Sequence, residues 1–156
     1  MQVTLREVRD TDFPIFFTHQ LDREANWMAA FTVVDPSDRS AWDARWERLR
    51  QDDKICIRTV LGDGEVVGSI LAYGEPGIRE ISYWIGKQHW GHGIATKAAR
   101  IFIAEVGDRP IYARVAKDNL GSMRVLEKCG FVIVMGDKNF AHARNRMIEE
   151  WVMRLE

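Results

Sequence analysis

A stretch in the middle of the chain, residues 79–106, restricts the fold more than any other part of the sequence. Residues 79–85 alternate their side chains between two faces, which is the period of a pleated β-strand. Residues 94–106 place apolar side chains on one side of a helix. Between them, Gly91 and Gly93 lack a Cβ, so backbone N–H groups can converge where the first helical turn leaves four donors unpaired. The pattern predicts a strand, a tight turn and a helix that together bind an anion, in particular a phosphate.

The glycines of this turn fit neither of two common nucleotide-binding patterns. The dinucleotide fingerprint needs a third glycine, and a P-loop needs Gly-Lys followed by Ser or Thr; neither is present. The residues alone also allow a second interpretation, in which the glycines of this turn serve only close packing.

Length, composition and charge exclude several classes of protein. A chain of 156 residues fits one domain, residues 1–156, which can bury about 70% of its unfolded surface. Its 46% hydrophobic and 29% charged residues are near the globular average, which disfavours disorder and coiled coil. A net charge of -1 argues against a general nucleic-acid surface, so no nucleic-acid partner is expected.

The sequence carries no membrane, export or metal signal. No apolar run approaches the roughly 18 residues that span a bilayer, and the first ten residues lack the apolar core of a signal peptide. We therefore expect a cytoplasmic protein with no membrane partner. The four histidines and two cysteines show no metal-ligand spacing, so no metal site is expected.

The remaining patterns predict strands and helices in a definite order. A meander of three antiparallel strands leads into the glycine turn, and the helix that follows crosses over to a parallel strand. In such a βαβ unit a ligand lies at the carboxyl ends of the strands. Residues 22–35 and the polar residues 136–144 show no regular pattern. The expected strands are residues 3–8, 54–61, 65–73, 79–85, 111–116, 131–135 and 146–154, and the expected helices are residues 14–21, 36–50, 94–106 and 120–128.

Two motifs resemble those of a known family. The turn Gln88-x-x-Gly91-x-Gly93 resembles the acyl-CoA pyrophosphate loop of the GNAT superfamily of N-acetyltransferases. Residues 119–131, with the pattern N-x-x-S-x-x-x-L-E-K-x-G-F, are similar to a stretch of the RimJ/RimL-like branch of that superfamily. The motifs lie in the family's order and at about its spacing, so the chain is identified as a member of the superfamily.

The resemblance implies an α/β fold, α+β by some schemes, with a GNAT-like mixed, mostly antiparallel central sheet of about seven strands flanked by helices. It also implies one parallel βαβ unit and a V-shaped splay between strands 4 and 5, where acetyl-CoA enters as the acetyl donor. The pantetheine arm pairs with the backbone of residues 83–85, and the pyrophosphate rests on the amides of residues 91–95. The cofactor-binding residues implied are Tyr83, Trp84, Ile85, Gln88, Trp90, Gly91, His92, Gly93, Ile94, Ala95 and Asn119.

The resemblance also implies catalytic residues, with departures from the family. Glu80 is the expected general base, acting through water, and Ser122 lies near the thioester sulfur. The backbone amide at about Ile85 is the family's usual oxyanion donor. Some related enzymes use a glutamate and a tyrosine where this chain has Arg114 and Leu126, so Ser122 is the expected substitute.

Each of these residues also has a structural interpretation. Glu80 fits an ordinary strand carboxylate beside Arg79 or Arg114. Asn119 fits a helix N-cap, and Ser122 fits a hydroxyl in the first helical turn. The sequence alone leaves both interpretations open.

The predicted function is transfer of an acetyl group from acetyl-CoA to a primary amine, either a protein N-terminus or a small amine, by direct attack in a ternary complex. The alternatives are a non-catalytic acyl-CoA-binding or sensing module and a nucleotide-binding domain. The final alternating strand is available to pair with a second copy or to swap between subunits, so a homodimer is one expectation. For an apolar or cationic acceptor, the expected pocket residues are Trp27, Met28, Phe31 and Tyr83, with Trp42 beside them and Asp35 or Glu75 as a counter-charge.

Overall fold

A seven-stranded sheet runs through the computed structural model, which describes residues 1–156, in the order β1-β2-β3-β4-β5-β7-β6. All neighbouring strands are antiparallel except β4 and β5, which are parallel. This arrangement confirms the predicted fold class. The strands are β1 (Val3–Arg6), β2 (Cys56–Gly62), β3 (Glu65–Tyr73), β4 (Arg79–Ile85), β5 (Ile111–Ala116), β6 (Val132–Ala141) and β7 (Arg146–Leu155).

Five α-helices flank the sheet, and none combines the length and the apolar character needed to cross a membrane. Asp22, Asp38 and Asn119 each precede a helix, and the side-chain oxygen of each accepts a hydrogen bond from an N–H of the first turn. The helices are α1 (Phe13–Leu21), α2 (Arg23–Ala29), α3 (Arg39–Gln51), α4 (Ile94–Val106) and α5 (Leu120–Lys128), with 3-10 turns η1 (Asp10–Asp12) and η2 (Lys87–His89).

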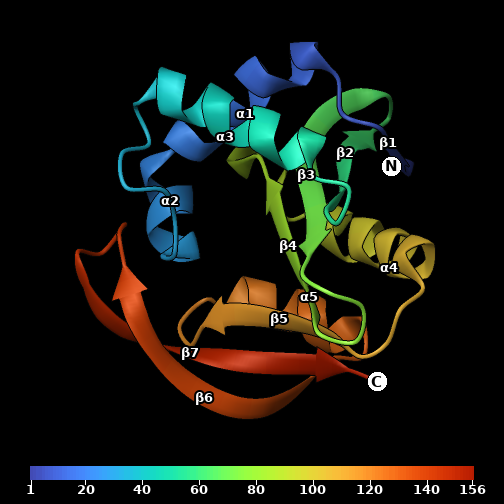
Figure 1. Ribbon diagram of the computed structural model, residues 1–156, viewed down its shortest axis with the longest axis vertical. Helices are drawn as coiled ribbons and strands as arrows, with labels where there is room; N and C mark the ends of the chain where they lie inside the picture. Colours follow the sequence, from blue (N-terminus) through green and yellow to red (C-terminus); the bar gives the residue numbers. More distant parts are fainter.

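The helices form layers on the two faces of the first four strands (Figure 1). α4 covers one face, where Ile94, Ala98 and Phe102 are buried in the main apolar core. α1 and α3 cover the other face, where the rings of Phe16 and Trp46 pack with centroids 4.8 Å apart. β6 and β7 lie at the opposite end of the molecule from α1 and α3 (Figure 1). The face of β4 that points away from α4 therefore looks toward the region where these two ends of the molecule meet.

β4 and β5 are paired at only one end. Arg79 pairs with Ile111 and Glu80 with Tyr112, and no further pair follows. β4 keeps β3 as its neighbour on the other side as far as Ile85. The two strands therefore diverge beyond Glu80, as Figure 1 shows, and this divergence is the splay expected between strands 4 and 5.

Two segments that were expected to be irregular are regular. Residues 22–35 contain α2, which begins where the Asp22 side chain accepts a hydrogen bond from the Ala25 N–H. Residues 136–141 belong to β6, whose pairing with β7 continues to Ala141. β6 is an edge strand with mostly exposed residues, so polar side chains such as Asp137 and Lys138 do not interrupt it.

The final strand is not at an edge of the sheet. β7 lies between β5 and β6, so both of its sides are paired. The free edges belong to β1 and β6. β7 therefore has no free edge at which to pair with a second copy, and edge-to-edge pairing would use β1 or β6. A swap of the final strand, and the homodimer itself, stay predictions.

Replacing Gly68 by alanine is expected to destabilise the fold at the open end of the splay. Gly68 pairs with Ile85, and a Cβ on Gly68 would lie 2.1 Å from the Trp84 carbonyl oxygen. β4 would have to shift, which should lower the free energy of unfolding in urea by about 1–3 kcal/mol. Gly121→Ala, in α5, is the control, since the nearest atom to its Cβ would be the Asn119 Oδ1 at 4.0 Å. Equal unfolding free energies for the two variants would contradict the close approach of β3 and β4.

Candidate active site

A cavity of about 510 Å³ lies between β4, the start of α4 and α5. We call it the glycine-turn cavity. The parallel crossover brings the starts of α4 and α5 to the carboxyl ends of β4 and β5, where the strands have separated. Gln88 and His92 are exposed and lie outside its wall. The other residues expected to bind the cofactor line it: Tyr83, Trp84, Ile85, Trp90, Gly91, Gly93, Ile94, Ala95 and Asn119.

The start of α4 has no side-chain cap, like the start of α1 and unlike those of α2, α3 and α5. Gly91 and Gly93 have φ of 83° and 72°, a left-handed conformation that favours glycine, and no atom lies within 4 Å of where a Cβ would stand. Lys97 is the first helical residue whose N–H has a backbone acceptor, the Gly93 carbonyl at 3.2 Å. The first turn of α4 therefore presents unpaired N–H groups beside open space, which fits a phosphate.

Hydroxyl groups of Tyr83 and Ser122 join two walls of this cavity. The Tyr83 Oη lies 2.7 Å from the Ser122 Oγ, so β4 and α5 are hydrogen-bonded across the splay. Burial raises the pKa of Tyr83 to about 12, and the phenol is therefore protonated at neutral pH. Near the glycine turn, the Trp90 indole donates to the Ile85 carbonyl at 2.9 Å and holds the turn against β4. The cavity thus contains a pair of neutral hydroxyls that can donate a proton.

Asn119 has the geometry of a helix N-cap. Its Oδ1 accepts a hydrogen bond from the Ser122 N–H at 3.2 Å. Its amide nitrogen makes no hydrogen bond within the chain, and the residue lines the glycine-turn cavity. The cap and a contact with a ligand are therefore compatible roles for this one side chain.

Glu80 belongs to a second cavity, of about 490 Å³, between β4 and β5. We call it the acidic cavity, because Glu80, Asp137 and Glu150 line it around one cation, Arg114. The Arg114 guanidinium lies 3.3 Å from Glu80, 2.8 Å from Asp137 and 3.5 Å from Glu150. Glu80 also accepts a hydrogen bond from the Tyr73 hydroxyl. Glu80 is thus an ion-pair partner of Arg114, and its action as a base stays a prediction.

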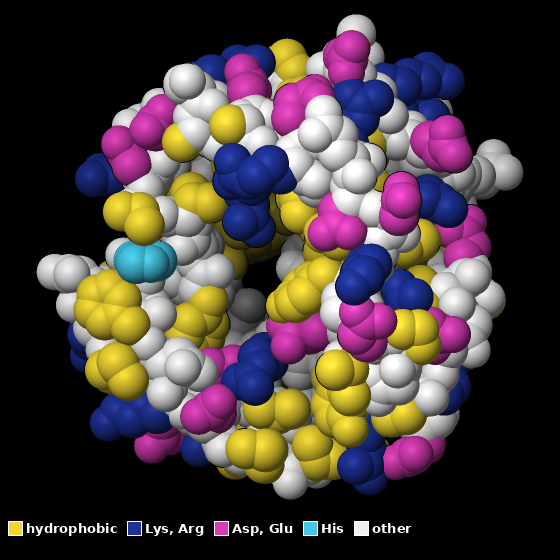
Figure 2. Space-filling model, in the orientation of Figure 1, with side chains coloured by type: hydrophobic (Ala, Val, Ile, Leu, Met, Phe, Trp, Pro, Cys, Tyr) yellow, Lys and Arg dark blue, Asp and Glu magenta, His cyan; other side chains and the backbone are white.

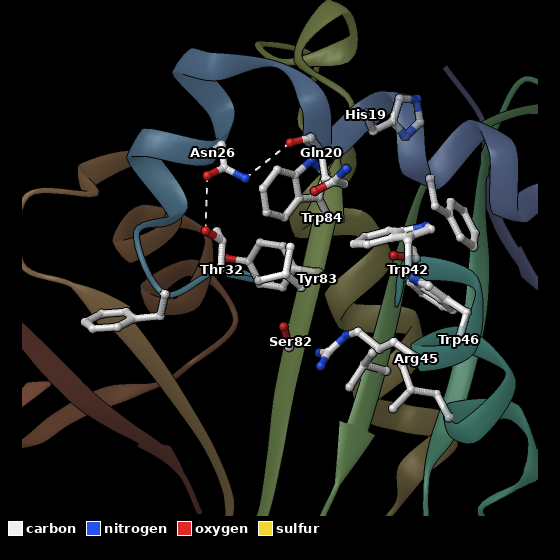
Figure 3. A pocket seen from close by; sticks show the side chains of 16 residues that line it. His19, Gln20, Asn26, Thr32, Trp42, Arg45, Trp46, Ser82, Tyr83 and Trp84 are labelled. Carbon is white, nitrogen blue, oxygen red and sulfur yellow. Dashed lines mark hydrogen bonds between the residues drawn. The ribbon is translucent and has the colours of Figure 1, made fainter. Parts of the chain in front are cut away.

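A third cavity, of about 240 Å³, lies between α1, α3 and the β3–β4 pair (Figure 3). We call it the tryptophan cavity, because Trp42, Trp46 and Trp84 line it. Tyr83 and Trp84 line all three cavities, which therefore meet at these two residues. Figure 2 shows that the molecule is hollowed at the centre of this face, with apolar, basic and acidic side chains around the hollow.

The side chains expected to hold the acceptor do not gather in one place. Phe31, Trp42 and Tyr83 line the tryptophan cavity, whereas Met28 lines the glycine-turn cavity. Trp27 lines none of the three, and the Arg144 guanidinium lies 5.0 Å from the centre of its ring. Only part of the expected acceptor pocket is therefore assembled.

The two acidic residues considered as counter-charges also lie elsewhere. Asp35 accepts hydrogen bonds from the Ser37 hydroxyl and N–H, and Glu75 pairs with Lys54 at 2.8 Å. Neither lines any of the three cavities. No group of three or more His, Cys, Asp or Glu side chains is placed to hold a metal ion.

Sequence reasoning missed the tryptophan cavity. Trp42 was expected beside the acceptor pocket, but its spacing from Trp46, one helical turn, gave no sign that the two line a cavity with Trp84. Gln20 and Arg45 also line the cavity, but they carry no local signal because α1 and α3 meet only in the folded chain. His89, on η2, was missed in the glycine-turn cavity, although its place beside the glycine motif was a usable signal.

Comparison with known proteins shows which family shares these features. Residues 2–132 match the family model described as "Acetyltransferase (GNAT) domain". The chain therefore belongs to the GNAT acetyltransferase family, as its two motifs indicated.

Individual relatives agree with this assignment. The probable N-acetyltransferase YjcK of Bacillus subtilis is 35% identical over 94 residues, 54% of this chain and 52% of that protein, so the match spans about half the length of the relative. Mycobacterium smegmatis RimJ in complex with CoA-disulfide has a TM-score of 0.83 at 22% identity, covering 98% of this chain and 81% of that one. Spermidine N-acetyltransferase from Vibrio cholerae in complex with CoA and spermine has a TM-score of 0.82 at 17% identity, covering 99% and 95%. At these identities the solved structures establish the shared fold.

Acidification is expected to destabilise the protein through His19, which lines the tryptophan cavity. Burial lowers the pKa of His19, which is 6% exposed and has an unpartnered Nδ1. The unfolded chain binds the proton more readily, so this stabilisation is complete above about pH 6.5 and is lost as the pH falls below it. Between pH 7 and 5, the free energy of unfolding in urea should fall more for wild type than for His19→Gln. Parallel pH profiles would contradict the buried, neutral imidazole.

Proposed function

We propose that this protein is an acetyl-CoA-dependent N-acetyltransferase that moves an acetyl group to a primary amine, a protein N-terminus or a small amine, by direct attack in a ternary complex. The observation that carries this proposal is the uncapped start of α4 beside the separated ends of β4 and β5, in a chain of the GNAT family. An anion site next to an unpaired strand edge suits a ligand with a diphosphate at one end and an amide-containing arm. Structural neighbours in complex with CoA support the same ligand.

Three parts of the chain would hold acetyl-CoA. The N–H groups of Ile94 and Ala95 would bind the pyrophosphate, with Gln88 and His92 as further contacts at the exposed rim of the turn. The backbone of residues 83–85 would pair with the pantetheine arm, and the free amide nitrogen of Asn119 would donate a hydrogen bond close by. When bound, acetyl-CoA supplies the thioester carbonyl that an amine attacks.

The acidic cavity would receive and deprotonate the amine. Its three carboxylates around Arg114 give it a negative charge that attracts an ammonium group. An α-amine with a pKa near 8 is about a tenth neutral at pH 7, so a weak base is sufficient for it. Glu80 would take the proton through a water, and the backbone amide near Ile85 would stabilise the oxyanion.

Tyr83 and Ser122 would protonate the departing thiolate. Related enzymes use a tyrosine on the helix that follows strand 5, but this chain has Leu126 there, which is 1% exposed and has no proton to give. The Tyr83 hydroxyl comes instead from β4 and reaches the same wall through Ser122. The hydroxyl pair thus replaces the missing tyrosine.

Three further expectations accompany this function. We propose one domain, residues 1–156, because strands from both ends of the chain belong to one sheet. A cytoplasmic location without nucleic-acid or membrane partners is supported by the sequence alone. A homodimer would use β6, the free edge that exposes Val132, Ile133 and Met135.

Two alternatives make different predictions. A non-catalytic acyl-CoA-binding module needs the glycine turn but neither Glu80 nor the hydroxyl pair. A nucleotide-binding domain needs only the anion site and should bind adenine nucleotides as well as CoA. Turnover separates the enzyme from the first, and ligand selectivity separates it from the second.

Gly93→Ala is expected to weaken acetyl-CoA binding about tenfold or more, because its Cβ would enter the open space beside the unpaired N–H groups. Gly107→Ala is the matched control at the other end of α4. Gly107 has a φ of 75°, and its Cβ also meets no atom within 4 Å, so the backbone strain is similar. Isothermal titration should show weaker binding only for Gly93→Ala. Equal affinities for the two variants would place the phosphate elsewhere.

Tyr83→Phe and Ser122→Ala are expected to lower kcat about 100-fold while changing acetyl-CoA affinity little, because a positioned acid contributes about that factor or more. Release of free thiol from acetyl-CoA, measured with an amine acceptor, follows the rate. Tyr112→Phe is the control, since Tyr112 lies on β5 outside the three cavities.

The other proposed groups are tested in the same assay. Glu80→Gln and Asn119→Ala should also retain acetyl-CoA binding and lose turnover. If all four variants keep the wild-type kcat, the chemistry does not use these residues and the non-catalytic module becomes the better description.

A further inference from the structure

The tryptophan cavity lies beside the proposed point of acetyl transfer. Tyr83 and Trp84 line both this cavity and the glycine-turn cavity, so a molecule in the tryptophan cavity has one end at Tyr83. The cavity volume of about 240 Å³ is below the roughly 300–1,000 Å³ of sites for drug-sized ligands. The cavity therefore suits an acceptor of about amino-acid size.

The wall of the tryptophan cavity is rich in polar groups without a partner. The indole N–H groups of Trp42, Trp46 and Trp84 are buried and make no hydrogen bond, and Trp46 is only 4% exposed. Gln20 is 2% exposed and donates to the Pro36 carbonyl at 2.7 Å, which leaves its Oε1 unpaired. A buried polar group without a partner costs about 1–3 kcal/mol. The unpartnered Nδ1 of His19 is a fifth such group in this wall. The three indole donors outnumber the one free amide oxygen, which favours a ligand with acceptor atoms.

Arg45 brings a positive charge to this cavity. In Figure 3 its side chain extends from α3 toward Ser82 on β4. Arg39 on the same helix pairs with Asp43, whereas Arg45 makes no hydrogen bond or ion pair. No aspartate or glutamate lines the cavity, and burial keeps the pKa of His19 below its ordinary value. Arg45, which is exposed on α3, is therefore the one charged side chain of the cavity wall without an ion-pair partner.

The acidic cavity on the other side has the opposite charge. There, three carboxylates lie within 3.5 Å of the single guanidinium of Arg114. The acidic cavity and the tryptophan cavity share Phe31, Ser82, Tyr83 and Trp84. A molecule at this junction therefore meets negative charge on one side and positive charge on the other.

We propose that the acceptor is an amino carboxylate of about amino-acid size, whose carboxylate pairs with Arg45 while its amine lies at Tyr83, toward the acidic cavity. This inference rests on the proposed function, because it names the acceptor of that reaction. A guanidinium binds a carboxylate through charge-assisted hydrogen bonds. A polyamine offers Arg45 no such group and would place a second cation beside it.

The test compares amino acids with their own carboxamides, which keep the shape and lose the negative charge. L-Leucine, L-methionine and L-phenylalanine, each with its carboxamide, are titrated calorimetrically into the protein in the presence of CoA. The variants are Arg45→Gln and, as the matched control, Arg48→Gln, which removes an exposed arginine of α3 outside the cavity. Acetyl transfer to the same compounds is followed separately.

At least one acid should bind wild type about tenfold or more tightly than its carboxamide. Arg45→Gln should abolish this preference and Arg48→Gln should keep it, with CoA affinity unchanged in both. Equal affinity for acid and carboxamide, a preference that survives in Arg45→Gln, or no binding of any acid would overturn the inference. If the protein binds acids selectively but transfers no acetyl group to them, the proposed function is contradicted instead. If it acetylates these compounds without preferring the acids, only the carboxylate site is contradicted.

Discussion

The short pairing between β4 and β5 is the constraint on which the rest of the structure depends. Only Arg79 and Glu80 of β4 pair with β5 before the strands separate. Backbone N–H and C=O groups inside a fold normally have partners, so an unpaired strand edge beside a cavity indicates a place for the amide groups of a ligand. The same separation creates the space in which three cavities meet at Tyr83 and Trp84.

Side-chain contacts and one backbone hydrogen bond, from the Ala143 N–H to the Ala30 carbonyl at 3.2 Å, hold the separated parts in position. On β5, Arg114 pairs with Glu80 of β4 at 3.3 Å, close to where the strands part. Arg144, in the turn between β6 and β7, is 8% exposed, donates to a backbone carbonyl of α2 at 3.0 Å and pairs with Asp118 at 2.9 Å. These ion pairs fix β6, β7, α2 and the start of α5 around the open end of the splay.

The predictable part of the site is the part whose determinants are adjacent in the sequence. Gly91 and Gly93 specify their turn locally, and the apolar period of the following helix does the same, so the cofactor side of the site could be predicted. α2 could not be predicted, because a helix of seven residues has few sequence signals beyond its N-cap at Asp22. The acceptor side depends on how α1 and α3 meet around a cavity that β3 and β4 also line. Residue type does not reveal that Arg45 is unpaired while Arg114 has three carboxylate partners.

The central claim is that the splay and the start of α4 form one acyl-CoA site. Isothermal titration of the protein with acetyl-CoA tests this claim most directly, with ATP and NAD as control ligands. The account predicts one acetyl-CoA site per chain and much weaker binding of both nucleotides, because only acetyl-CoA can use the strand edge and the phosphate turn together. No heat at ligand concentrations up to about a millimolar, an affinity weaker than about -4 kcal/mol, would contradict it, as would ATP binding as tightly as acetyl-CoA.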